Sequence, residues 1–94
     1  MIRFTVVWDA VVEAHFLQAW LESDAATRAI LSEVATTIDR TLAVDAHTKG
    51  ELQANPQVRG EVIQVAKASI SVFYEVETEE RIVRVVRLVF RRTT

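Results

Sequence analysis

EVIQVAKASISVFYEVETEERIVRVVRLVF, residues 61–90, is the stretch of the chain that decides the fold. Its middle part, ISVFYEVE (70–77), alternates with the period of two that is typical of a strand with one buried face. Ile70, Val72, Tyr74 and Val76 share one face, and Ser71, Phe73, Glu75 and Glu77 share the other. We expect further strands at 61–66 and 81–90, and the short links between the three predict an antiparallel meander.

Upstream of the meander, the pattern predicts one strand and two helices. IRFTVVW (2–8) is rich in β-branched and aromatic residues and alternates as a strand does. From residue 10 the apolar residues recur at spacing four, which predicts helices over about 10–22 and 25–43. Asp9 is placed to cap the first helix, and Ser23 or Asp24 the second. The short break between the helices predicts an antiparallel α-hairpin.

The expected fold class is therefore α+β, with the element order β-α-α-β-β-β and one domain over residues 1–94. The antiparallel α-hairpin should pack on one face of a four-stranded, largely antiparallel sheet. The stretch 44–60 holds both glycines and the only proline and is the long irregular segment of the chain. In it, Gly50 is expected to supply a positive φ angle.

Composition excludes several classes of protein. The net charge is −2, which is unlike the strongly basic balance of a nucleic-acid-binding domain. The chain has no cysteine, so it has neither disulfides nor thiolate chemistry. The sequence shows no signal peptide and no apolar run long enough for a membrane helix, which favours a cytoplasmic protein. His15 and His47 lack the spacing of metal ligands, and we expect no metal or other cofactor.

The order and spacing of four segments resemble the toxins of the RelE/ParE superfamily of bacterial toxin–antitoxin modules. The segments are VVWDAVVEAHFLQAWLE (6–22), IDRTLAVDAHTKGE (38–51), VRGEVIQV (58–65) and SVFYEV (71–76). The resemblance in the order of elements extends over nearly the whole chain. The resemblance implies a small toxin that is held inactive by a cognate antitoxin. RelE-like members cut messenger RNA on the ribosome, whereas ParE-like members inhibit DNA gyrase.

The RelE pattern implies groups that this chain mostly lacks. Lysines on the second main strand correspond here to Val62 and Gln64, and an arginine on the third corresponds to Ser71. Arg92 matches the arginine after the last strand, and no tyrosine-bearing tail follows it before Thr94. Because RNA cleavage needs a general base, a general acid and cations at the phosphate, we expect no enzyme of the RelE type.

The leading hypothesis is a ParE-like toxin that acts by protein binding, with DNA gyrase as a candidate target and a cognate antitoxin as its partner. One alternative is a ribosome-dependent mRNA endoribonuclease of the RelE type, with Arg92, Arg59 and Lys49 in a rearranged site. Another is a non-toxic binding module that keeps the fold and forms a homodimer through the sheet near Tyr74 and Phe73.

Five arginines lie on or after the last expected strand. Strict alternation places Arg84 and Arg92 on one face and Arg81, Arg87 and Arg91 on the other, so no single basic patch is expected. Apart from Phe90, no aromatic residue interleaves with them in the sequence. A stacking platform for bases is therefore not expected, which argues against direct nucleic-acid binding. Arginine is suited to pairing with antitoxin carboxylates, and tryptophan to anchoring an interface. The residues predicted to bind the partner are Arg91, Arg92, Arg59, Trp20 and Tyr74.

Overall fold

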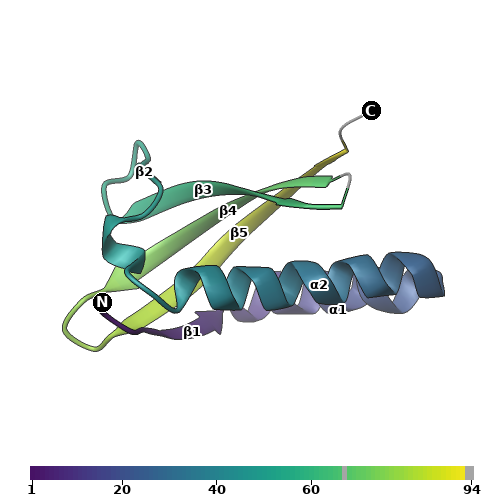
Figure 1. Cartoon of the computed structure of the whole chain (residues 1–94), viewed down its shortest axis with the longest axis horizontal. Helices are drawn as coiled ribbons and strands as arrows, with labels where there is room; N and C mark the ends of the chain where they lie inside the picture. Colours follow the sequence, from purple (N-terminus) through teal and green to yellow (C-terminus); the bar gives the residue numbers. More distant parts are fainter. Residues whose placement is uncertain (67, 93–94) are drawn as a thin grey trace.

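The two helices of the protein lie on one side of a five-stranded mixed sheet (Figure 1). The computed structural model describes residues 1–66 and 68–92, the last of these by its backbone alone. The elements are β1 (Thr5–Trp8), α1 (Ala10–Glu22), α2 (Ala25–Leu42), a 3-10 turn η1 (Ala46–Thr48), β2 (Glu51–Leu52), β3 (Val58–Val65), β4 (Ala68–Glu77) and β5 (Ile82–Arg92). The strand order is β1-β5-β4-β3-β2.

The predicted fold class is confirmed, with additions that the sequence did not reveal. The meander β3-β4-β5 is antiparallel throughout, as expected. β1 joins it in parallel beside β5, with Thr5 opposite Ile82 and Trp8 opposite Val85. The fifth strand, β2, is only two residues long and pairs with the start of β3. It lies in the stretch 44–60 that was expected to be irregular.

The helix boundaries follow from their caps. The Asp9 carboxylate accepts a hydrogen bond from the Val11 amide at 3.0 Å, and Asp24 accepts one from the Thr27 amide at 2.8 Å. Each carboxylate satisfies an amide that has no partner within its own helix, which fixes where that helix begins. Ser23 and Asp24 were both candidates for the N-cap of α2, and Asp24 is the residue that caps it.

The core lies between α2 and the sheet. α2 buries Val34, Ile38 and Leu42, and the strands of the meander contribute six further buried side chains: Val65, Ile70, Val72, Tyr74, Val83 and Val85. By contrast, α1 buries no residue completely, although most of its side chains are apolar. The second helix therefore carries most of the packing, while the first leaves apolar surface exposed.

β5 contains a bulge, and because of it the arginines of this strand do not lie on the faces that were predicted for them. Tyr74 of β4 is opposite Val85, but Phe73 is opposite Arg87, so Val86 is an extra residue in the strand. The extra residue shifts the alternation by one position. Arg84, Arg87 and Arg91 consequently share one face of the sheet, and the prediction that Arg84 lies opposite the other two was wrong.

Candidate functional site

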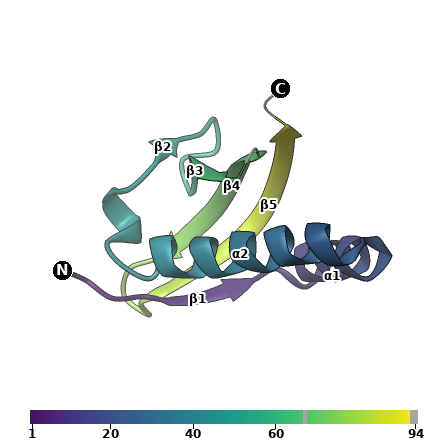
Figure 2. The same cartoon turned by 45° about the vertical axis from the view of Figure 1, so that its right-hand side comes forward.

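The sheet face turned away from the helices is the surface on which the chain gathers chemically distinctive side chains. Both helices lie on the other side of the sheet (Figure 2). The strand register sets Arg84 beside Glu75, Arg87 beside Phe73 and Arg91 beside Ser69 on this outer face. All three arginines are exposed. We call Arg84, Arg87 and Arg91 the arginine row.

Three of the positions that the family resemblance assigns to RNA cleavage, Val62, Gln64 and Ser71, meet on the same face. Val62 pairs with Ser71 in the register of β3 and β4, and Gln64 pairs with Ser69. Val62 is 59% exposed, so this part of the surface is apolar where the RelE pattern places a lysine. The fold thus brings the expected catalytic positions together, but the side chains there provide neither a general base nor a positive charge.

Phe73 lies at the centre of this face, between β3 and the arginine row. A Cβ added at Gly60 would lie 3.0 Å from the Phe73 ring, so the ring rests against the bare backbone of that glycine. On the other side, the Arg87 guanidinium lies 5.6 Å from the ring centroid. An aromatic residue therefore does lie among the arginines. The sequence alone had indicated otherwise because this neighbour is on another strand.

Lys49 and Arg59 lie together, but they hold the loop after α2 in place. The Lys49 carbonyl accepts hydrogen bonds from the Tyr74 hydroxyl at 3.0 Å and from Arg59 Nη1 at 3.1 Å. The Lys49 ammonium donates to the Thr41 carbonyl at the end of α2, at 2.6 Å. Both cations thus make contacts that stabilise the fold.

Burial raises the pKa of Tyr74 to about 12, with a further increase from the Glu61 carboxylate and a partial decrease from Arg59. The side chain has no solvent-accessible surface. Because an unfolded chain releases this proton near pH 10, the contribution of neutral Tyr74 to stability is complete below about pH 10. It should be lost as the pH rises from there through about 12.

This shift can be measured directly, because Tyr74 is the only tyrosine in the chain. In a spectrophotometric titration of the folded protein, tyrosinate absorbance should appear with a midpoint near pH 12, while in denaturant it should appear near pH 10. The Tyr74→Phe variant, which has no tyrosine, gives the baseline. A midpoint near 10 in the folded protein would show that the hydroxyl is accessible to water.

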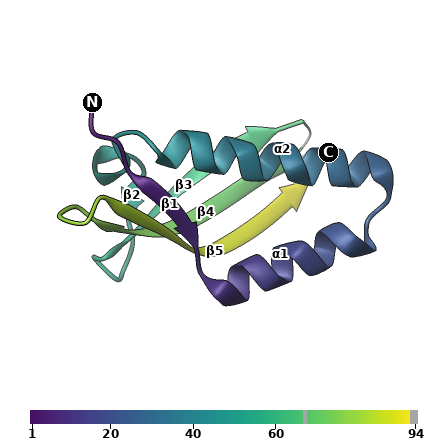
Figure 3. The same ribbon diagram turned by 90° about the horizontal axis from the view of Figure 1, so that it is seen from below.

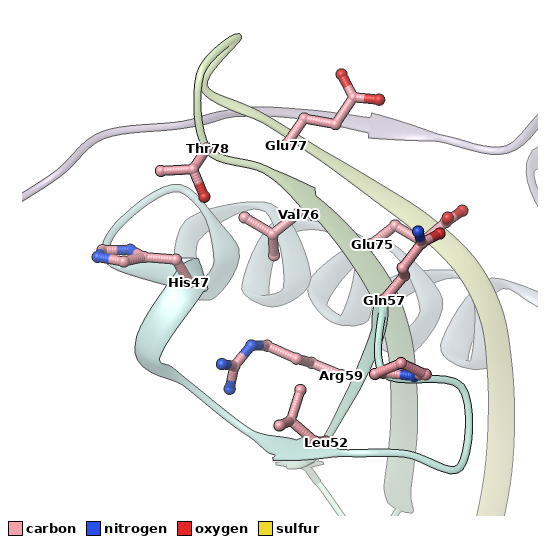
Figure 4. A pocket seen from close by; sticks show the side chains of 9 residues that line it. His47, Leu52, Gln57, Arg59, Glu75, Val76, Glu77 and Thr78 are labelled. Atoms are coloured by element: carbon pink, nitrogen blue, oxygen red, sulfur yellow. The ribbon is translucent and has the colours of Figure 1, made fainter.

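A hollow of about 450 Å³ lies beside η1 and the ends of β2 and β3. Figure 4 shows Arg59 extending into it on the side of His47 and Leu52, with Glu75 and Glu77 also on its lining. His47 packs on Phe4 with the ring centroids 5.5 Å apart, and its Nδ1 is buried without a hydrogen-bond partner. Two carboxylates and one guanidinium on the lining do not favour the binding of a phosphate.

Four of the five residues predicted to bind a partner have described side chains, and these four do not share a surface. Arg91 belongs to the arginine row, whereas Tyr74 is buried in the core and Arg59 is bound to the loop. Trp20 is half-buried between the helices, where its indole N–H donates to Ser32 at 3.2 Å and the Arg28 guanidinium lies 4.6 Å from its ring centroid. The Arg92 side chain lies outside the described residues. The sequence reasoning named Phe73 only for a homodimer contact together with Tyr74, and these two residues lie on opposite faces of the sheet. It did not place Arg84 and Arg87 beside Phe73, because only the strand register and the bulge bring them together.

Among residues 1–66 and 68–92, no group of three or more histidine, aspartate or glutamate side chains is arranged to hold a metal ion. No helix in the same part of the chain has the length and hydropathy needed to cross a membrane.

Comparison with known proteins finds similarity in structure only. No family model and no curated protein matches the sequence. Two solved structures of an E. coli RelE toxin double mutant are similar in fold. One is a complex with an antitoxin RelBc peptide, with a TM-score of 0.49, 15% identity and coverage of 93% of this chain and 82% of the other. The other is the free toxin, with a TM-score of 0.49, 17% identity and coverage of 94% and 82%.

Proposed function

We propose that this chain is the toxin of a bacterial toxin–antitoxin pair and that it acts in the cytoplasm by binding a protein, in the manner of ParE-like toxins. The toxin assignment is supported by the sequence resemblance, whose strand, cap and helix segments occur in the folded chain in the expected order. On this proposal the antitoxin neutralises the toxin by covering its binding surface.

The observation that carries the mode of action is the pairing of Val62 with Ser71 on the outer face of the sheet. A nuclease of the RelE type needs cations and proton-transfer groups at these positions, and this chain has an alkyl group and a hydroxyl there. Inhibition by binding requires no such groups. It requires a surface that a partner protein can cover, and an open sheet face with a half-buried aromatic at its centre is of that kind.

The arginine row favours an acidic antitoxin. The row concentrates positive charge on one face of a chain whose net charge is −2. Guanidinium groups form paired hydrogen bonds with carboxylates, and they are less strongly hydrated than ammonium groups. An antitoxin segment that carries aspartate or glutamate would thus be attracted to this face rather than to the rest of the surface.

Induced expression of the chain alone should arrest growth and lower the supercoiling activity of DNA gyrase, both in cells and with purified components. Co-expression of an acidic protein encoded in the adjacent reading frame should restore growth. A transcript of the same gene with an early stop codon controls for the burden of expression. Normal growth at confirmed expression would contradict the toxin assignment and favour a non-toxic binding module.

Primer extension on translated messenger RNA separates this proposal from the ribonuclease alternative. That alternative is tested because Arg87 and Phe73 lie in contact on the outer face of the sheet. A cation beside an aromatic ring is one element of a nucleic-acid surface. Our proposal expects no new cleavage sites after induction. Cleavage that depends on ribosomes and is lost in the Arg87→Ala variant would overturn it in favour of an enzyme of the RelE type.

A further inference from the structure

The second half of β3 has an open edge. β2 pairs with β3 only at Arg59 and Gly60, so within residues 1–66 and 68–92 no strand lies beside 61–65 on the side away from β4. Figure 1 shows β2 beside the start of β3 alone. An open strand edge presents unpaired N–H and C=O groups that can bond to another extended segment.

The free backbone groups on this edge can be assigned from the hydrogen bonds of the loop before β3. The Val58 amide donates to the Asn55 carbonyl at 3.0 Å, and the Val58 carbonyl accepts from the Gln53 amide at 3.0 Å. Both groups of Val58 therefore point toward β2 and away from β4. Because this direction alternates along an antiparallel strand, the N–H and C=O groups of Val62 and Gln64 point to the open edge.

This edge has few of the features that keep strands from pairing. Proteins commonly block an edge with lysine, proline, a bulge or a charge that points inward. Residues 61–65, EVIQV, include neither lysine nor proline, and their register with β4 has no bulge. The one charged side chain among them is Glu61, which lies beside buried Val72 on the inner face. The edge is thus short, rich in β-branched residues and nearly uncharged.

The same five residues fit a second copy of themselves. In an antiparallel pair centred on Ile63, Val62 of each copy lies opposite Gln64 of the other, because the contact is two-fold symmetric. These are the residues whose backbone groups point to the edge, so each such pair can exchange both of its N–H···O=C hydrogen bonds. Glu61 lies opposite Val65 of the other copy, and no like charges face each other.

The ends of the open stretch agree with this register. β3 ends at Val65, and Ala66, with φ +53°, begins the turn to β4. The strand of one copy therefore ends where β2 of the other copy begins to occupy the edge, at Gly60. A register centred on Val62 would instead bring Gln64 of the second copy opposite Gly60, where Glu51 is already paired.

The open edge of β5 is less suited to a second copy. β5 continues past the end of β1 (Figure 3), beside an opening of about 460 Å³ that is lined by α1 and β5. Antiparallel pairing of two such edges centred on Val89 would set Arg87 opposite Arg91 in both halves of the contact. Like charges directly opposite each other are destabilising, and the β3 edge has no such conflict.

We propose that two copies of the chain associate through residues 61–65 of β3, which pair in antiparallel orientation about a two-fold axis at Ile63 and join the two sheets into one. The axis is perpendicular to the sheet, so both outer faces lie on the same side of the dimer. At the usual spacing of neighbouring strands, the two arginine rows would be about 24 Å apart. The inference goes beyond the proposed function, because it requires neither an antitoxin nor a target.

Sedimentation equilibrium of the purified chain tests the association. Because five residues from each copy form a small interface, we expect a monomer–dimer equilibrium with a Kd of about 10–100 μM. The average mass should therefore rise from that of the monomer toward that of the dimer between about 5 and 500 μM. A chain that is monomeric throughout this range would overturn the inference.

Charges placed on the facing pair test the register. Val62→Lys/Gln64→Lys sets lysine opposite lysine in both halves and should weaken association by at least about tenfold. Val62→Lys/Gln64→Glu sets lysine opposite glutamate, so its Kd should lie within about threefold of the parent value. Ala54→Lys/Gln57→Lys makes the same change in net charge as the lysine pair, at exposed positions outside the edge. Equal weakening by the two lysine pairs, or no recovery with lysine and glutamate, would contradict this pairing.

Hydrogen exchange locates the contact. As the protein concentration rises through the Kd, the amides of Val62 and Gln64 should become protected, while those of residues 86–91 on β5 keep their rates. A dimer in which Val62 and Gln64 exchange at unchanged rates would form elsewhere and would overturn the inference. Protection that appears only when another protein is added to a monomeric chain would assign the edge to a different partner and would overturn it as well.

Discussion

Replacing Gly50 by alanine is expected to lower the free energy of unfolding by about 3 kcal/mol, from two separate causes. The backbone at Gly50 has φ +67°, where any residue with a Cβ is strained. An added Cβ would also lie 2.6 Å from the Gly60 carbonyl oxygen and 2.8 Å from the Tyr74 hydroxyl. The first contact is with backbone inside the sheet, so it cannot be relieved by rotating a side chain.

Urea denaturation followed by tryptophan fluorescence measures this loss. Ala54→Ser, an exposed substitution in the same loop, should change stability by no more than about 0.5 kcal/mol and serves as the control. The tyrosinate titration gives a second readout, because displacement of Lys49 would open the surroundings of Tyr74 and lower its pKa from about 12. A Gly50→Ala variant as stable as the parent would mean that the loop does not pack on Gly60 as described.

Ile38→Ala should cost about 3–4 kcal/mol, since it removes a large side chain from the centre of the core and leaves a cavity. Ile38 is 1% exposed and lies between Val34 and Leu42 on the buried stripe of α2. For a small domain this is a large fraction of the total stability. We expect a clear fall in the midpoint of thermal unfolding, measured by circular dichroism.

Leu17→Ala in α1 is the matched control, because it removes a similar volume from a side chain that is 54% exposed. It should change stability by no more than about 0.5 kcal/mol. The comparison also tests whether the outward face of α1 is truly free of packing. If Leu17→Ala were as costly as Ile38→Ala, α1 would have to be buried in a way that the structure does not show.

Local patterns were sufficient to predict most of the elements. Asp9 and Asp24 mark both helix starts because capping depends only on residues one to three positions away. The alternation of Ile70, Val72 and Tyr74 predicted the buried face of β4 correctly. Gly50 has the positive φ angle expected of it.

What the sequence could not reveal depends on contacts between distant segments. The parallel pairing of β1 with β5 joins residues far apart in the chain, and no local signal specifies it. The contact between Phe73 and Arg87 requires the register of β4 and β5, and that register requires the bulge. For these reasons the arginine row was predicted as two separate groups.

The helix α1 also differs from the sequence prediction, because its apolar residues are not confined to one buried side. The spacing of Val12, Phe16 and Trp20 predicted a helix with a buried side, but none of the three is fully buried. Phe16 makes an edge contact with Trp8 at 5.2 Å between ring centroids. Apolar side chains also extend around the rest of the helix, including Val11 and Leu17. A pattern of this kind is typical of a helix that binds something beyond its own domain.

The additional residue at Val86 has a mechanical consequence that is distinct from its effect on charge. If Val86 were deleted, regular alternation from Val85 onward would still leave Arg87 and Arg91 on the outer face. The distribution of charge would then be unchanged, but the strand would lose the bend and added twist that a bulge produces. Figure 2 shows β5 curving away from the helices toward its C-terminal end. The curvature of one strand thus sets the width of the opening beside α1, and a straighter strand would close the opening without altering the electrostatics of the surface.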